Sequence, residues 1–215
     1  DGEVWLKLAD GTSLDLTKLE GRRLRAVRPN MHMVFQDPYS ALDPRMTVQD
    51  IVMEPIIYNR LARGADALER ARAALEMVGL QDRHMQLYPH AFSGGQRQRI
   101  GIARSLVCNP RLIVCDEAVS ALDVSIQAQV LNLLQDMQGN LGLSYVFIAH
   151  NLAVVRHIAH RVAVMYVGKL VELSSTEQLF SRPRHPYTEA LLSAIPEPDP
   201  DRKSARKVLR GETAN

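Results

Sequence analysis

Cysteine is scarce in this chain, with only Cys108 and Cys115 among 215 residues. Both lie in or beside apolar runs, and two thiols are too few to build a metal cage. We therefore expect buried, reduced thiols, as in a cytoplasmic protein. Long apolar runs are missing as well, because no stretch approaches the roughly 20 residues that span a bilayer. The first residues also lack a charged and then apolar leader of the secretory type.

An excess of charge of one sign is absent too. The formal net charge is +2, so there is no electrostatic argument for nucleic acid as the main partner. The length fits one compact domain, or one domain with a smaller lobe. The chain starts at Asp1 and passes at once into the apolar-patterned residues Val4, Trp5 and Leu6. We therefore expect a chain cut inside a domain.

The first 44 residues predict short strands and one helix. Residues 4–16 have the pattern of a hairpin that turns at Asp10-Gly11. Residues 19–27 are basic and predict a helix, which the following Pro29 ends. Residues 31–35 form a short apolar run that predicts a strand.

Residues 45–108 predict a lobe made mostly of helices. Helical periodicity covers 47–59 and 65–78, and a further helix begins at Ser93. In the second of these segments one face is apolar: it carries Leu68, Ala71, Ala74, Leu75 and Val78.

After Pro110 the pattern alternates between strands and helices, which predicts an α/β sheet with right-handed crossovers. The run 112–115 is continuously apolar, so we expect a strand of a parallel sheet that is buried on both faces. Residues 143–149 predict a second buried strand. The remaining predictions are helices over 126–137 and 151–158, a hairpin over 161–173 through Gly168, and a poorly ordered, proline-rich end from Pro196.

Two carboxylates follow the first of these apolar strands. Ligands of open α/β sheets bind beyond the carboxyl ends of the strands, so Asp116 and Glu117 are expected to project into a site. Asp116 can hold Mg²⁺, because a hard cation prefers oxygen ligands. Glu117 can polarise a water molecule that attacks a γ-phosphate. Taken alone, an Asp-Glu pair also fits an ordinary solvent-facing strand end.

A glycine-containing turn opens the helix that begins near residue 93. Ser93 is a good N-cap, and Gly94 and Gly95 allow a backbone to approach a ligand closely. The free N–H groups and the helix dipole favour a bound phosphate there. The residues 96–99 are expected to keep the exposed face polar. A capped helix after a flexible turn is the alternative for this segment alone.

Two further polar residues are candidates for the same site. His150 follows the apolar run 143–149, where a neutral imidazole could contact a γ-phosphate and orient the water. Gln36 lies in the proline-flanked loop 36–44 and could reach the metal or the water. Each is also compatible with a purely structural role.

In this order and spacing, the motifs resemble the nucleotide-binding subunits of ATP-binding cassette (ABC) transporters. The matching stretches are Val34–Pro38 (Q-loop), Phe92–Arg99 (signature), Leu112–Glu117 (Walker B), Ser120–Asp123 (D-loop) and His150 (switch histidine). The resemblance runs from residue 1 to about 195. It implies a P-loop NTPase-type α/β core sheet over 1–44 and 109–182, a helical signature subdomain over 45–108, and a partly disordered C-terminal tail over 183–215.

The resemblance also implies roles for these residues. Asp116 and Gln36 would contact Mg²⁺, and Glu117 would be the general base. Gln36 and His150 would complete the catalytic set by contacting the water, the metal or the γ-phosphate. In a dimer, the signature residues and the D-loop would reach the ATP held by the opposite subunit; they are Ser93, Gly94, Gly95, Gln96 and Asp123.

A finer resemblance is to oligopeptide and dipeptide importers. It rests on residues 36–48, 117–125 and 184–192. The implied partners are a second ATPase subunit, transmembrane permease subunits and, indirectly, a substrate-binding protein outside the membrane, with the chain on the cytoplasmic face. Related importers of nickel or glutathione share these features, so the cargo stays open.

One family motif is missing. The sequence contains no Gly-x-x-x-x-Gly-Lys-Ser/Thr phosphate loop (Walker A), and we interpret the chain as incomplete at its N-terminus. Without that cradle for the β- and γ-phosphates, we predict that the chain alone hydrolyses no ATP. Two alternatives stay open: a non-catalytic module that complements the ATP site of a partner, and an ABC ATPase with no role in transport.

Overall fold

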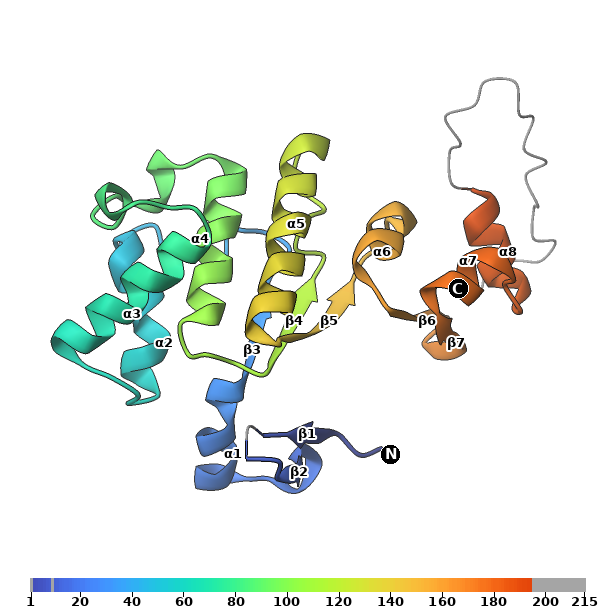
Figure 1. The fold of residues 1–215 in the computed structure, drawn as a ribbon, viewed down its shortest axis with the longest axis horizontal. Helices are drawn as coiled ribbons and strands as arrows, with labels where there is room; N and C mark the ends of the chain where they lie inside the picture. Colours follow the sequence, from blue (N-terminus) through green and yellow to red (C-terminus); the bar gives the residue numbers. More distant parts are fainter. Residues whose placement is uncertain (1, 9, 195–215) are drawn as a thin grey trace. The chain divides into compact units, whose positions relative to one another are not determined.

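The computed structural model describes residues 2–8 and 10–194 (Figure 1). The described residues divide into two compact units, one that ends at Ile148 and one that begins at Ala149. The sequence predicted a different subdivision, with a core over 1–44 and 109–182, and this subdivision stays a prediction. The predicted disorder of the proline-rich end falls outside the described residues.

The first unit begins with the predicted hairpin. Strands β1 (Trp5–Lys7) and β2 (Ser13–Asp15) pair antiparallel, and Gly11 in the turn has a φ of +86°, which only glycine adopts without strain. Helix α1 (Gly21–Val27) ends as predicted ahead of Pro29, and strand β3 (Met31–Val34) follows.

The predicted helical segments are confirmed. They form α2 (Val48–Tyr58), α3 (Gly64–Met77) and α4 (Gly94–Leu106), which pack against one another. The apolar face expected on α3 is buried, with Ala71, Ala74 and Leu75 at most 1% exposed. Short 3₁₀ helices lie at Leu16–Lys18, Arg28–Asn30, Asp82–His84 and Pro89–Ala91.

The centre of the first unit is a parallel sheet with the order β3-β4-β5. Strand β4 (Leu112–Asp116) and strand β5 (Ser144–Ile148) are joined through α5 (Val124–Leu141). Helices α4 and α5 contact each other, and α4 also packs against β3 (Figure 1). The predicted α/β fold with a parallel sheet is therefore confirmed.

The prediction that β4 is buried on both faces, and that β5 is a second buried strand, is wrong. In β4 only alternate residues, Ile113 and Cys115, are fully buried at 0% exposed. In β5 the side chains of Val146 and Ile148 are 49% and 47% exposed. The apolar content of a strand does not determine its burial, because the exposure of each face depends on what packs against it.

The second unit contains α6 (Leu152–Ile158), the antiparallel strands β6 (Arg161–Tyr166) and β7 (Lys169–Ser175), α7 (Thr176–Ser181) and α8 (Pro186–Ser193). The hairpin predicted through Gly168 is confirmed. Its core contains Val162, Val164 and Leu179. Throughout the described ranges, every helix is too short or too polar to cross a bilayer.

Candidate nucleotide-hydrolysis site

Gln36 and Glu117 lie next to each other at one edge of the parallel sheet. Strand β3 ends two residues before Gln36, and β4 ends one residue before Glu117. Because neighbouring parallel strands end at the same edge, both residues leave the sheet on the same side. The Gln36 amide Nε2 donates a hydrogen bond of 2.7 Å to the Glu117 carboxylate Oε2. The structure thus joins two predicted site residues that are 81 positions apart.

The backbone of Glu117 is held in an unusual conformation. Its φ of +46° lies in the left-handed region, which costs a residue with a side chain roughly 1–2 kcal/mol. Three hydrogen bonds fix it there: the Glu117 N–H donates to Ile148 O at 3.0 Å, and its carbonyl accepts from the Ser120 N–H at 3.0 Å and from Ser120 Oγ at 2.9 Å. Strain held by surrounding bonds is typical of functional positions.

Asp116 and His150 are the other two residues that were predicted to act at this edge. Asp116 is the last residue of β4, half-buried, and pairs in register with Ile148 of β5. His150 belongs to the second unit, is exposed, and lies two residues before α6. The metal-binding role of Asp116 and the water-orienting role of His150 stay predictions.

The signature turn, residues 93–96, forms a reciprocal capping box at the start of α4. Ser93 Oγ accepts from the Gln96 N–H at 3.3 Å, and Gln96 Oε1 accepts from the Ser93 N–H at 3.1 Å. Ser93 is nevertheless exposed, Gly94 is half-buried and Gly95 is buried. Asp123, the residue before α5, is also exposed, so the exposed members of this predicted trans half-site are Ser93 and Asp123.

The prediction that residues 96–99 keep the exposed face polar is wrong for two of the four, Arg97 and Gln98. Arg97 is 8% exposed and Gln98 is 2% exposed. The Arg97 Nε donates to the Pro89 carbonyl at 2.7 Å, and its guanidinium carbon lies 3.9 Å from the ring centroid of Tyr39. A buried arginine is tolerated because its hydrogen bonds and the aromatic face replace water.

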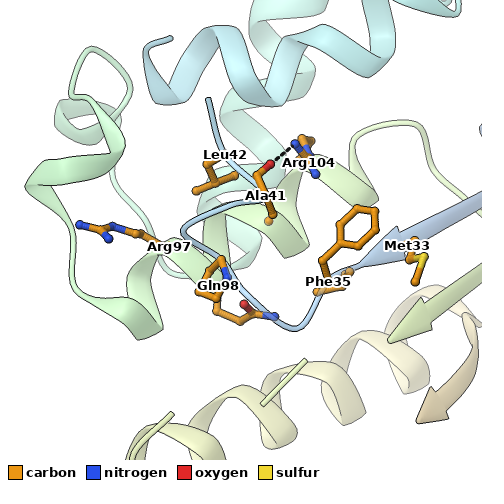
Figure 2. Close-up of a pocket in the computed structure, with 10 residues that line it drawn as sticks. Met33, Phe35, Ala41, Leu42, Arg97, Gln98 and Arg104 are labelled. Atoms are coloured by element: carbon orange, nitrogen blue, oxygen red, sulfur yellow. Dashed lines mark hydrogen bonds between the residues drawn. The ribbon is translucent and has the colours of Figure 1, made fainter. Parts of the chain in front are cut away.

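A second arginine of α4 also binds the loop that follows Gln36. Arg104 Nη1 donates to the carbonyl of Ala41 at 2.7 Å, as Figure 2 shows. Arg97 and Arg104 are seven positions apart, so they lie on the same side of α4. Together they fasten the Gln36 loop, residues 36–44, to the signature helix.

Burial around this loop changes the charge behaviour of two groups. Burial lowers the pKa of the His32 imidazole, and the positive charge of Arg104 lowers it further. Burial also lowers the pKa of the Arg104 guanidinium, which Glu54 opposes. Burial and the nearby Arg104 charge therefore both disfavour the protonated form of His32.

Sequence reasoning missed three residues that shape the site: Tyr39, Arg97 and Arg104. Arginine side chains on a polar helix give no pattern that separates exposed from buried positions. The seven-residue spacing of the two arginines was the one available signal, since it places them on a common face.

The fold and this site define a class: an α/β protein of the nucleotide-hydrolase type, with polar residues at the carboxyl edge of a parallel sheet. Residues 2–120 match the family described as ABC transporter, which covers more than half of the chain. The chain belongs to the ABC transporter family. Residues 171–215 match a second family description, the C-terminal region of oligopeptide/dipeptide transporters.

Proteins with similar sequences agree with this assignment. The putative peptide import ATP-binding protein of Brucella ovis is 54% identical over 198 residues, which are 92% of this chain and 62% of that protein. The oligopeptide transport ATP-binding protein OppF of Salmonella typhimurium is 50% identical over 216 residues, covering 99% of this chain and 63% of the relative. The chain therefore spans less than two thirds of the length of these curated relatives.

Solved structures show the same fold. A dimeric ATP-binding cassette in a post-hydrolysis state, bound to ADP and Pi, is 28% identical with a TM-score of 0.68, covering 82% of this chain and 74% of that one. The protein cbiO1 of Clostridium perfringens, part of the ABC transporter complex cbiONQ, is 25% identical with a TM-score of 0.69, covering 82% and 70%.

Proposed function

We propose that this chain is part of the ATP-hydrolysing subunit of an ABC importer that energises the uptake of di- and oligopeptides. The observation that carries the proposal is the 2.7 Å contact between Gln36 and Glu117, directly beyond Asp116 at the end of β4. The match of residues 171–215 to the oligopeptide/dipeptide transporter region supports the cargo class. Relatives are named for peptide and for glutathione import, and nickel was the third cargo that the sequence left open.

In this function Glu117 is the general base. Its carboxylate accepts the Gln36 amide hydrogen bond through Oε2, and a carboxylate held in this way can take a proton from a water molecule. The fixed left-handed backbone orients the carboxylate, since Glu117 cannot rotate about φ without losing the bonds to Ile148 and Ser120. Gln36 holds the base from the loop that follows the neighbouring strand, β3.

The donor groups at this edge fit Mg²⁺ and a nucleotide together. Within the described residues no three His, Cys, Asp or Glu side chains come together to hold an ion. Mg²⁺ in phosphate-transferring sites needs only one or two protein oxygens, because phosphate and water oxygens complete its octahedron. Asp116 would supply a carboxylate oxygen, and Gln36 would supply its Oε1, since Nε2 is the atom that donates to Glu117. When bound, the ion neutralises charge that develops on the phosphate oxygens.

The second half of the proposed machinery acts on a partner's nucleotide. The thirteen-residue helix α4 presents its first N–H groups at the signature turn, where an anion is favoured. The exposed Ser93 and Asp123 would reach the ATP of a second subunit, together with Gly94, Gly95 and Gln96. Permease subunits in the membrane would hold the dimer on the cytoplasmic face.

The purified 215-residue chain is expected to hydrolyse no Mg-ATP, because the phosphate cradle is absent from its sequence. The measurement is phosphate release against a buffer blank, with Glu117→Gln as the matched control. Turnover by the chain that the Gln variant abolishes would contradict this expectation.

The exposed Ser93 and Asp123 favour a second candidate function. In this function the chain is a non-catalytic module that complements the ATP site of a partner. Mixing the chain with a full-length OppF-type subunit carrying its own phosphate loop distinguishes the two. Mg-ATP-dependent association that leaves the partner's hydrolysis unchanged supports an importer fragment. A marked rise in the partner's hydrolysis supports the complementing module, and no association with ATP, compared with ADP, contradicts both.

A further inference from the structure

Helix α4, which begins with the signature turn, packs closely against helix α5, which follows the D-loop, at Gly95. Gly95 lies in the first turn of α4 and is buried, while Ile126 lies in the first turn of α5. A Cβ atom added at Gly95 would lie 2.3 Å from Ile126 Cγ2, far inside any real carbon–carbon contact. At Gly94, by contrast, an added Cβ would lie 3.8 Å from Leu122 Cδ2, an ordinary contact.

The Ile126 methyl group cannot move aside at low cost. Its Cγ2 is bonded directly to Cβ, and the χ1 angle of a β-branched residue is strongly restricted within a helix. Any side chain at position 95 therefore has to push α4 and α5 apart. Close helix packing accounts for glycine at this position, independently of any ligand.

We infer that Gly95 and Ile126 join the signature turn and the D-loop (Ser120–Asp123) into one rigid element. Ile126 is then a positioning residue: it touches no nucleotide, but it fixes where Asp123 stands relative to Ser93. The inference about packing stands on the geometry alone, and its consequence for catalysis rests on the proposed function. In that function the signature turn and the D-loop contact the same nucleotide, which the partner subunit holds. A fixed spacing between the two segments would let them bind and release that nucleotide together.

A double-mutant cycle on the chain tests the inference without nucleotide. Gly95→Ala should lower the folded-to-unfolded ratio roughly 5- to 150-fold, as overpacking does. It should also raise amide exchange in the peptide 120–126 about tenfold or more. In an Ile126→Ala background the same Gly95→Ala change should be neutral or stabilising, because the methyl is gone and alanine favours helix.

Matched variants exclude a general effect of these substitutions. Ile126→Val keeps both γ carbons, so it should fail to rescue Gly95→Ala. Gly139→Ala in α5, where an added Cβ meets no atom within 4 Å, should leave the peptide 120–126 unchanged. Should Gly95→Ala alone fail to fold, recovery of a cooperative melt in the Gly95→Ala, Ile126→Ala double variant supports the contact.

The inference is overturned if Gly95→Ala is tolerated with Ile126 present, or if Ile126→Ala gives no rescue. Because no nucleotide takes part, this result is independent of the ATP-dependent association that tests the proposed function. A successful cycle with no association leaves the packing inference standing and removes only its catalytic consequence.

Discussion

At the scale of single residues, Glu117 carries both backbone strain and the proposed chemistry. Its left-handed backbone should make glycine more favourable than alanine at this position. We expect Glu117→Gly to be more stable than Glu117→Ala by about 1 kcal/mol, since both variants lose the bond to Gln36 and only alanine keeps the Cβ clash. Urea denaturation of the two variants measures the difference. An alanine variant of equal or higher stability would show that position 117 is not strained.

His32 should make the stability of the folded chain depend on pH. It is half-buried in β3, its Nε2 has no hydrogen-bond partner within the described ranges, and burial and then Arg104 lower its pKa from 6.5. The unfolded chain therefore binds a proton near pH 6.5 that the folded chain rejects. The free energy of unfolding should fall as the pH falls below about 6.5, down to the lowered folded pKa.

His32→Leu isolates this contribution. Thermal melts between pH 8 and pH 5 should show a smaller loss of melting temperature for the variant than for the original chain. Equal losses in both proteins would mean that His32 does not contribute to acid destabilisation.

At the scale of elements, the Gln36 loop depends on α4. Arg97 stacks on Tyr39, and Arg104 binds the Ala41 carbonyl, so the loop that begins with Gln36 at the edge of the sheet is fastened twice. A cation–π contact of a desolvated arginine is worth about 1–2 kcal/mol. Tyr39→Leu should therefore raise amide exchange over residues 36–44 roughly fivefold or more, whereas Tyr39→Phe keeps the ring and should not. Hydrogen exchange read by mass spectrometry tests both; equal protection in all three proteins would contradict the fastening.

Element positions were largely predictable, because their ends are fixed by local chemistry. Ser93 caps α4 with its own side chain, Gly11 turns the first hairpin, and Pro29 follows the end of α1. The side that each element buries was less predictable. Arg97 and Gln98 are buried because other segments pack around α4. Since both residues are polar, the periodicity of apolar residues in the sequence does not predict that they are buried.

The same distinction applies to the site. The motifs predicted that Asp116 and Glu117 follow a strand, since that depends only on neighbours in the sequence. The contact of Gln36 with Glu117 and the approach of Gly95 to Ile126 depend on which strands and helices become neighbours in space. Such pairs are separated by many residues, and a single sequence contains no direct record of them.

At the scale of the whole molecule, one face of the parallel sheet is apolar and partly exposed. Met33, Val114 and Val146 are in register across β3, β4 and β5, so their side chains lie on the same face. Met33 is 39% exposed, Val146 is 49% exposed, and Ile148, two residues further along β5, is 47% exposed. Parallel sheets are normally covered on both faces, so this face has the properties of a surface that binds further apolar groups.

The exposed face makes a prediction for the purified chain. The folded chain should bind the dye ANS, which fluoresces on exposed apolar surface. The double variant Val146→Thr, Ile148→Thr should lower this fluorescence at least twofold. Threonine adds a hydroxyl group but keeps the β-branched shape that strands favour. Val124→Thr is the control: Val124 is 82% exposed at the start of α5, away from this face in sequence, and its change should have no effect. The reduction must occur with an unchanged far-UV spectrum and a cooperative melt, since dye binding by a partly unfolded chain would rise with loss of packing. Equal fluorescence from the double variant and the original chain would mean that the dye binds elsewhere. That result would contradict the prediction that this sheet face is an apolar surface exposed to solvent.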